Sequence, residues 1–261
     1  MRKLIISTCF CWLVISGMAI AQSSENPAMP GFNAAGSDKK AIEIADEVMT
    51  ALGGRENWDN TRHITWNFFG RRTLVWDKWT GDYRLQADSL LVLMNLNTQN
   101  GRAWINGSEV TEDAKRAELL KRANSIWIND SYWMFMPYKL KDSGVTLKYI
   151  GDMESESGAM CDVLQLTFEN VGDTPQNKYH VFVNSETHLV DQWSYFSNAE
   201  DDKPRFTTPW QHWTQHGKIM LSNDRGERKH TNIAVFDILP AKVYESPEPI
   251  DIMQFKIGMT D

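Results

Sequence analysis

Two histidines four residues apart are the first candidates for chemistry in this sequence. His212 and His216 lie in the run PWQHWTQHG, residues 209–217. On a helix this spacing would place both imidazoles on one face, where they could hold a metal ion. The run lies between a proline-containing loop and an apolar stretch, and the sequence offers no nearby third ligand. We therefore expect two loop histidines and no metal site.

One cysteine and two sets of carboxylates are the other candidates for chemistry. Cys161 could act as a nucleophile with a distant histidine, but it opens an apolar strand, where a small buried residue fits equally well. Glu154 with Glu156, and the acidic residues 200–202, pair carboxylates as a glycosidase does, yet both sets lie in polar stretches typical of solvated charge. The short motifs of nucleotide-binding proteins, serine hydrolases and zinc proteases are missing from the sequence.

The overall composition favours binding over catalysis or nucleic-acid recognition. The 261 residues carry a formal net charge of -7, and 42% of them are hydrophobic, with 11 Trp and 12 Met. No basic surplus is present to neutralise phosphates, so we expect no nucleic-acid partner. We also expect no cofactor and no enzymatic activity, with a hydrolase that uses Cys161 or a loop carboxylate as the least favoured hypothesis.

The first 21 residues have the pattern of a secretory signal peptide. Arg2 and Lys3 precede an uncharged apolar run, residues 4–20, and a small-x-small cleavage signal ends at Ala21. We predict cleavage after Ala21 and a periplasmic or secreted protein, with an uncleaved anchor as the alternative, because the run is near the lower limit for a spanning helix. After cleavage only Cys161 remains of the three cysteines, so no internal disulfide forms.

The rest of the chain is predicted to comprise a flexible leader and a single domain. Residues 22–36 are polar and contain Pro and Gly, and we assign residues 37–261 to the domain. Apolar residues at helical spacing predict a helix that begins at Ser37 or Asp38 and ends before Gly53. This helix would pack one apolar stripe against a sheet.

From Thr61 onward the apolar residues alternate, which predicts an antiparallel meander of roughly eleven short strands. A helical segment interrupts the meander at residues 111–123, and the following stretch, residues 126–140, is rich in large apolar residues. Pro137 should prevent a clean helical continuation there. The predicted fold class is therefore mainly β, of the α+β type.

The sequence contains more large aromatic side chains than the core of one sheet with one helix requires. Either they form a bulky core, or they line a concave apolar face that stays open for a ligand. Strand alternation and the apolar stretch at residues 126–140 predict which residues would line such a cavity. They are Trp66, Phe68, Leu74, Trp76, Leu85, Trp104, Trp127, Trp133, Met134, Met136, Leu166, Phe168, Trp193 and Tyr195.

Four segments of the sequence resemble a known family. They are residues 129–140 (NDSYWMFMPYKL), 162–168, 183–190 and the run 210–217 before residues 218–222. With the order of elements, they make residues 38–240 resemble the periplasmic lipoprotein-carrier and lipoprotein-sorting superfamily (LolA/LolB-like), in an uncharacterised secreted branch. The resemblance implies an open antiparallel half-barrel with an N-terminal helix and a helical lid on its concave face, which in the carriers holds acyl chains.

Two functions remain open at this point. The first is a periplasmic carrier that binds lipid or lipoprotein acyl chains in a hydrophobic concavity, with residues 126–140 as the lid. The second is a non-catalytic envelope sensor or protein-interaction module on the same scaffold, which would have an envelope protein as its partner. In both cases we expect no stable membrane span after signal cleavage.

Overall fold

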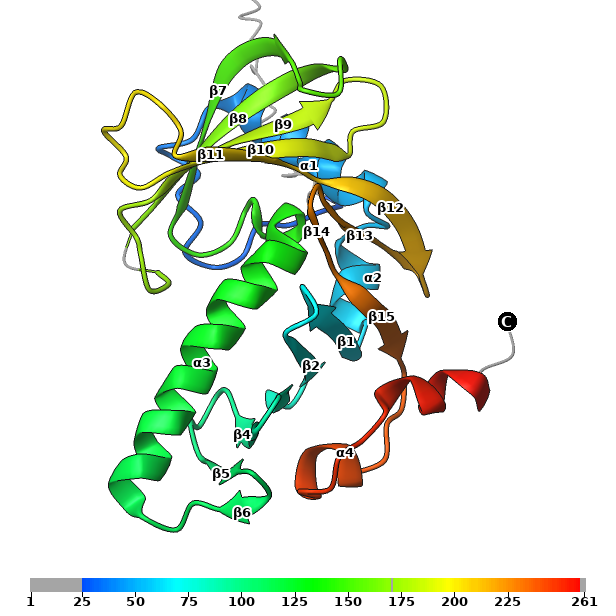
Figure 1. The fold of residues 1–261 in the computed structure, drawn as a ribbon. Coiled ribbons are helices and arrows are strands. Elements are labelled where there is room, and N and C mark those ends of the chain that lie inside the picture. Colours follow the sequence, from blue (N-terminus) through cyan, green and yellow to red (C-terminus); the bar gives the residue numbers. More distant parts are fainter. Residues whose placement is uncertain (1–24, 170, 259–261) are drawn as a thin grey trace, which may run out of the picture.

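The computed structural model describes residues 25–169 and 171–258, so the expected signal peptide lies outside the described residues. Three antiparallel sheets curve around one long helix, α3 (Asp113–Phe135), as Figure 1 shows. The architecture is mainly β with open sheets, an N-terminal helix and a helix across the inner face. The predicted fold class is confirmed.

The strands follow one another in simple meanders. In spatial order, the seven-stranded sheet consists of β15 (Thr231–Phe236), β1 (His63–Phe68), β2 (Arg72–Asp77), β3 (Asp82–Ala87), β4 (Leu90–Asn95), β5 (Gly101–Ile105) and β6 (Ser108–Glu109). The five-stranded sheet consists of β11 (Phe206–Pro209), β10 (Val190–Phe196), β9 (Lys178–Asn184), β8 (Met160–Phe168) and β7 (Val145–Glu154). The three-stranded sheet consists of β12 (Gln211–His216), β13 (Ile219–Arg225) and β14 (Arg228–Lys229).

Fifteen strands are present among the described residues, where the sequence predicted roughly eleven. Part of the difference lies in β11 and β12, which occupy residues 206–216, where loops were expected. Their polar side chains hide the strand period, and cross-strand pairing with β10 and β13 decides the conformation. Asn106 and Gly107, a pair typical of tight hairpin turns, both have positive φ (50° and 78°) and join β5 to β6.

The N-terminal helix is close to its predicted bounds. It is α1 (Lys39–Ala51), and its apolar stripe packs into the main core. Gly53 follows with φ 108°, and a Cβ there would meet the Lys218 carbonyl oxygen at 2.3 Å. The short α2 (Arg55–Asn60) comes next. Gly53 is therefore required both for the helix end and for the close approach of β13.

The helical segment predicted at residues 111–123 extends further along the chain than expected. Residues 126–135 were expected to be irregular, but α3 runs without a break to Phe135, and Pro137 lies in the one-turn 3-10 helix η1 (Met136–Lys139) that follows. A proline excludes helical geometry only close to itself, so it shapes the end of α3 and leaves the preceding turns intact. The apolar side chains on several sides of this half of α3 are accommodated because both large sheets contact it.

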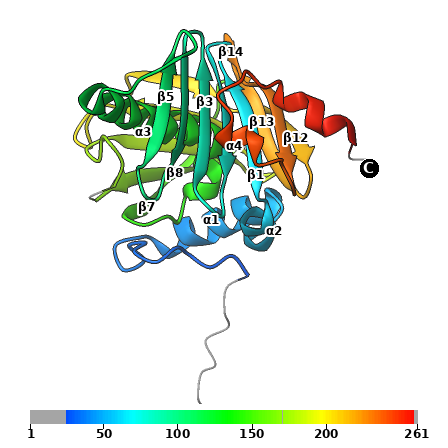
Figure 2. The same cartoon turned by 90° about the horizontal axis from the view of Figure 1, so that it is seen from below.

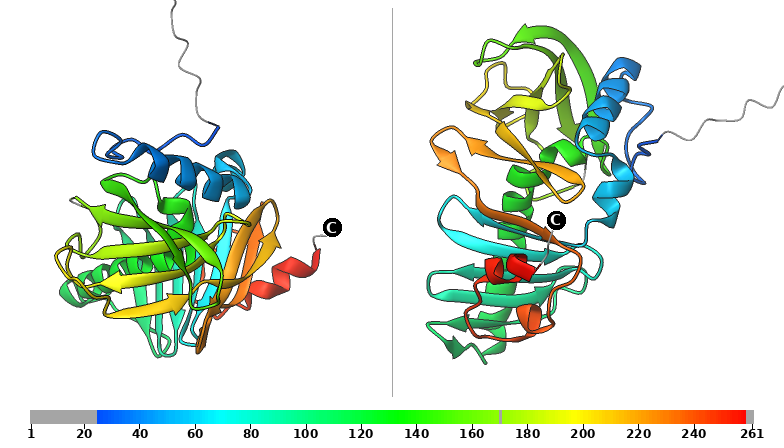
Figure 3. Two further views of the ribbon diagram at one scale, coloured as in Figure 1. Left: turned by 90° about the horizontal axis from the view of Figure 1, so that it is seen from above. Right: turned by 90° about the vertical axis from the view of Figure 1, so that its right-hand side faces the viewer.

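The outer face of the seven-stranded sheet has a cover of its own. The C-terminal segment, with α4 (Lys242–Glu245) and η2 (Ile252–Gly258), lies across the face opposite α3 (Figure 2 and Figure 3, right). It builds a second, smaller apolar cluster with Val75 and Phe236 of the sheet. Both faces of β1 are therefore buried, and His63 and Thr65, which alternate with Ile64 and Trp66, are only 2% and 0% exposed.

The described part of the expected leader, residues 25–36, is attached to the domain. The Asn26 side chain donates to the Thr50 hydroxyl at 2.8 Å, and the Asn33 main-chain NH donates to the Val145 carbonyl at 3.1 Å. This segment thus bridges α1 and β7. Among the described residues, no helix is both long and apolar enough to cross a membrane.

Candidate functional site

The two histidines that suggested a metal site lie on a strand. His212 and His216 are both in β12. At about 3.3 Å per residue, positions four apart on a strand are separated by about 13 Å, too far for two ligands on one ion. In the described part of the chain, no group of three His, Cys, Asp or Glu side chains could hold a metal ion.

The cysteine and the carboxylates lie in surroundings that do not activate them. Cys161 is fully buried on β8, and burial raises the pKa of its thiol to about 11, so the nucleophilic thiolate is not formed near neutral pH. Glu154 and Glu156 are exposed, as are Glu200 and Asp202, and Asp201 is half-buried. These side chains show the solvated environment expected for loop charges.

A cavity of about 590 Å³ lies between α3 and the inner face of the five-stranded sheet. Residues 127–133 of α3 form one side of it, and the opposite side is formed by Phe168 at the end of β8 and Tyr179 of β9. Segments 139–145 and 171–174 complete the walls. This size lies within the range of small-molecule sites in proteins.

The fourteen residues predicted to line a cavity divide into three groups. Trp127, Trp133 and Phe168 line the cavity. Trp76 and Tyr195 are half-buried but do not line it. The remaining residues are buried and do not line it. Trp104 lies outside the main core, because Ala103, the residue before it on β5, takes the core face. The others are in the main core, between the sheets and α3: Trp66, Phe68, Leu74, Leu85, Met134, Met136, Leu166 and Trp193.

Several lining residues were not among those predicted. Tyr132 is adjacent to Trp133 in the sequence, and Tyr179 pairs with Leu166 across β8 and β9. Both could have been predicted, because each is next to a residue that was expected to line the cavity. Val171, Asp173 and Thr174 lie in a loop without periodic pattern. No sequence signal indicates that this loop folds back toward α3.

Aromatic rings form a continuous wall from the cavity into the core. Tyr132 packs against Tyr179 with ring centroids 5.4 Å apart, and Tyr179 stacks on Trp193 at 4.8 Å and 11°. Trp133 contacts Trp193 edge-on at 5.0 Å. Burial raises the pKa of Tyr179 to about 12 and raises that of Tyr132 as well, so both phenols are neutral at physiological pH.

One buried ion pair fastens α3 to the seven-stranded sheet. Arg72 of β2 donates two hydrogen bonds to the Asp130 carboxylate, at 2.6 and 2.7 Å, and the Asp130 side chain is fully buried. Burial raises the pKa of Asp130, and the Arg72 guanidinium opposes this effect. A bidentate pair of this kind fixes the position of the helix over the sheet.

A second cation holds the end of α3. Arg225 of β13 is buried, stacks over the Trp210 ring at 3.5 Å and donates to the Trp133 carbonyl at 3.0 Å. Burial lowers the pKa of Arg225, and the nearby Asp224 opposes this. Its bond to a carbonyl in the last turn of α3 favours a helix that ends here.

Several buried polar atoms at the contact between α3 and the sheets have no protein partner among the described residues. They are Nε1 of Trp66, Trp127 and Trp193 and the hydroxyls of Tyr83 and Tyr132. Each such atom destabilises the packed state by about 1–3 kcal/mol relative to a satisfied one. The contact between α3 and the sheets is therefore well packed but incompletely hydrogen-bonded.

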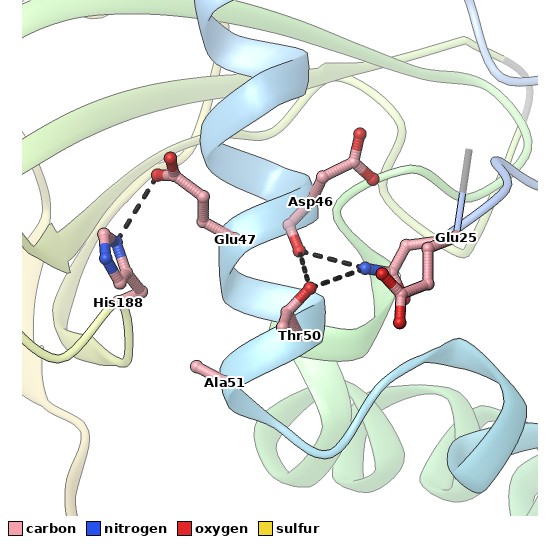
Figure 4. Close-up of a pocket in the computed structure, with 7 residues that line it drawn as sticks. Glu25, Asp46, Glu47, Thr50, Ala51 and His188 are labelled. Carbon is pink, nitrogen blue, oxygen red and sulfur yellow. Dashed lines mark hydrogen bonds and ion pairs between the residues drawn. The ribbon is translucent and has the colours of Figure 1, made fainter. Parts of the chain in front are cut away.

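A second hollow of about 490 Å³ lies along α1 (Figure 4). Glu25, Asp46, Glu47, Thr50 and His188 line it, and His188 forms an ion pair with Glu47 at 3.4 Å. Asp46 is also paired, with Lys141. Its walls are mostly polar residues, several of which already bind one another, and the Trp, Tyr and Phe rings that line the cavity beside α3 have no counterpart among its lining residues.

Comparisons with known proteins give matches only among solved structures. A scan of protein families and a search of curated proteins find no match. A DUF1329 family protein from Desulfovibrio piger has 13% identity and a TM-score of 0.42, with 79% of this chain and 97% of that chain covered. A putative outer membrane lipoprotein-sorting protein domain from Vibrio parahaemolyticus has 12% identity and a TM-score of 0.41, with 79% and 96% covered.

A LolA superfamily protein from Nitrosomonas europaea is also similar, with 10% identity, a TM-score of 0.31, and 78% of this chain and 96% of that chain covered. At these identities and TM-scores, neither the Vibrio nor the Nitrosomonas protein assigns a role to this chain. A ligand for this chain has to be argued from its own residues.

Proposed function

We propose that this protein is an exported binding protein for an apolar ligand, with a lipid or lipoprotein acyl chain as the guest. The observation that carries the proposal is the cavity beside α3, whose lining includes five aromatic rings that pack against the main core. Burial of an acyl chain yields about 0.8 kcal/mol per CH₂ group. No catalytic group is needed for this role.

The cavity is the part of the binding site that is accessible when α3 is in place. We propose that α3 is the lid, and that its displacement opens the inner face formed by the buried residues Trp66, Leu85 and Trp193. The partnerless polar atoms at this contact support the idea, because displacement would allow them to bind water or ligand. The Arg72–Asp130 pair would then be the main latch of the lid.

The experiment uses the full chain, purified without lipid stripping, and dodecanoate as the probe. Native mass spectrometry should detect co-purified lipid, and dodecanoate should shift the Trp fluorescence, because Trp127 and Trp133 line the cavity. Absence of both signals would refute the proposal. N-terminal sequencing of the exported protein should begin at Gln22 if the predicted cleavage is correct.

A charged variant gives the matched comparison. Phe168→Glu places a carboxylate at the half-buried cavity wall and should abolish dodecanoate binding. Met160→Glu introduces the same side chain on the same strand at a position that is 57% exposed, and should leave binding unchanged. Equal loss in both variants would show that the cavity is not the binding site.

A further inference from the structure

The walls of the cavity beside α3 are richer in rings than in aliphatic side chains. Trp127, Tyr132, Trp133, Phe168 and Tyr179 line it, whereas Ile128, Val145 and Val171 are its aliphatic lining. An acyl chain gains from any apolar wall, so it does not require rings. The face of an aromatic ring additionally attracts a cation through its quadrupole.

Three of these rings form a compact group. The centroids of Tyr132 and Tyr179 are 5.4 Å apart, those of Phe168 and Tyr179 are 5.7 Å apart, and those of Tyr132 and Phe168 are 6.2 Å apart. Two of the three pairs are edge-to-face, with interplanar angles of 84° and 77°. All three residues also line the cavity, so a guest there contacts this group of rings.

The charged side chains of the lining carry a net negative charge. Lys139 and Asp142 form an ion pair with each other, so they largely neutralise one another. Asp173 is exposed on the opposite loop, and no basic side chain of the described residues pairs with it. One unneutralised carboxylate therefore stands beside a wall of rings.

We propose that the guest of this cavity is an amphiphile with an alkylammonium head, held among the rings and next to Asp173 while its apolar tail extends toward the core under α3. This inference rests on the proposed function and specifies the head group of its ligand. Aromatic walls combined with a carboxylate are the usual means by which proteins recognise quaternary ammonium groups. A head with a negative charge would instead face Asp173 without compensation.

The test compares three probes that share one dodecyl tail: dodecyltrimethylammonium, dodecanoate and dodecyl maltoside, each below its micelle concentration. Isothermal titration with the full chain should give an affinity for the ammonium probe about tenfold above either of the others. Equal affinities for all three would overturn the inference and retain the proposed function. Absence of binding by all three would overturn both.

Variants separate charge and ring contributions from folding. Asp173→Asn should lower the affinity for the ammonium probe about threefold and leave the affinity for the maltoside unchanged. Asp202→Asn removes the same charge from an exposed loop and should change neither affinity. Tyr179→Leu keeps an apolar wall but removes a ring. It should lower the affinity for the ammonium probe about fivefold, and the affinity for the maltoside should change by less than about twofold. Equal weakening of both probes by Tyr179→Leu would contradict recognition through the ring face.

Discussion

The two faces of the seven-stranded sheet are covered in different ways. On the inner face, α3 is anchored to this sheet through the Arg72–Asp130 pair, and five polar atoms at its contact with the sheets lack protein partners among the described residues. On the outer face, Arg84 of β3 donates to the carbonyl oxygens of Val243, Ser246 and Glu248, at 3.2, 2.9 and 2.7 Å.

The difference lies in what each buried arginine binds. Arg84 is 2% exposed and binds main-chain carbonyls of the C-terminal segment, so it ties down that segment whatever its side chains are. Burial lowers the pKa of Arg84 to about 10, which still leaves it charged at neutral pH. Arg72 binds one carboxylate on one helix. The outer cover is thus held through its main chain, whereas α3 is held by one side-chain ion pair and by the bond from Arg225 to the Trp133 carbonyl.

The largest expected effect comes from breaking the inner anchor. Arg72→Met leaves the Asp130 carboxylate buried without a cation and should lower the free energy of unfolding by about 3–5 kcal/mol. Urea unfolding followed by Trp fluorescence measures it. Arg102→Met is the control, because its pair with Glu109 is exposed and should contribute at most about 0.5 kcal/mol. A similar loss in both variants would contradict the special role of Arg72.

Loss of the Arg84 hydrogen bonds should affect mainly the C-terminal segment that they hold. Arg84→Met leaves the carbonyls of Val243 and Glu248 with one partner fewer each and should lower stability by about 2 kcal/mol. Hydrogen exchange should increase in residues 240–258, while α3 stays protected. Faster exchange in α3 would show that the two covers are coupled through the sheet.

The pH dependence of stability tests the inner cover separately from the outer one. Burial, and next to it the Arg225 charge, lowers the pKa of His230 to about 3, from an ordinary value near 6.5. Because the folded-state value is depressed, the neutral ring contributes stability above about pH 6.5, and this is lost as the pH falls toward 3, by at most about 1.4 kcal/mol per pH unit.

The measurement is the free energy of unfolding between pH 7 and pH 4. His230→Gln should reduce the acid-side slope, since one titrating group is removed from a buried position beside β15. An unchanged slope in His230→Gln would assign acid sensitivity to other groups, such as the buried His63 under the outer cover, whose pKa burial also lowers.

The smallest effect concerns the partnerless hydroxyls. Tyr83→Phe and Tyr132→Phe remove buried oxygens that have no protein partner among the described residues, and each should raise the free energy of unfolding by about 1 kcal/mol. Tyr138→Phe is the opposite case, because the Tyr138 hydroxyl donates its one proton to the Met220 carbonyl at 2.7 Å, with the Leu52 carbonyl also near at 3.0 Å, and accepts from the Met220 main-chain NH. This variant should cost about 1 kcal/mol. Thermal unfolding of the three variants distinguishes these outcomes.

Periodicity was sufficient for most of the architecture. The alternation of Ile64, Trp66 and Phe68 predicts β1 and its inner face, and the helical spacing up to Leu52 predicts α1, because both patterns are local. The break expected before Pro137 shows the limit of local reasoning. Packing between two sheets keeps α3 helical to Phe135, against the expectation from its composition.

The candidate site shows the same division. From the residues alone, the rings of Trp127, Trp133 and Phe168 were assigned to a cavity, and they line it. Nothing local distinguishes them from Trp66 or Trp193, which have the same chemistry but lie buried beneath α3. The periodicity of the sequence predicts which face of a strand or helix a side chain lies on. Whether a cavity remains on that face depends on the positions of α3 and of the loop at residues 171–174, which are distant in sequence. The sequence thus determined an apolar inner surface, and tertiary packing decided which part of it stays open.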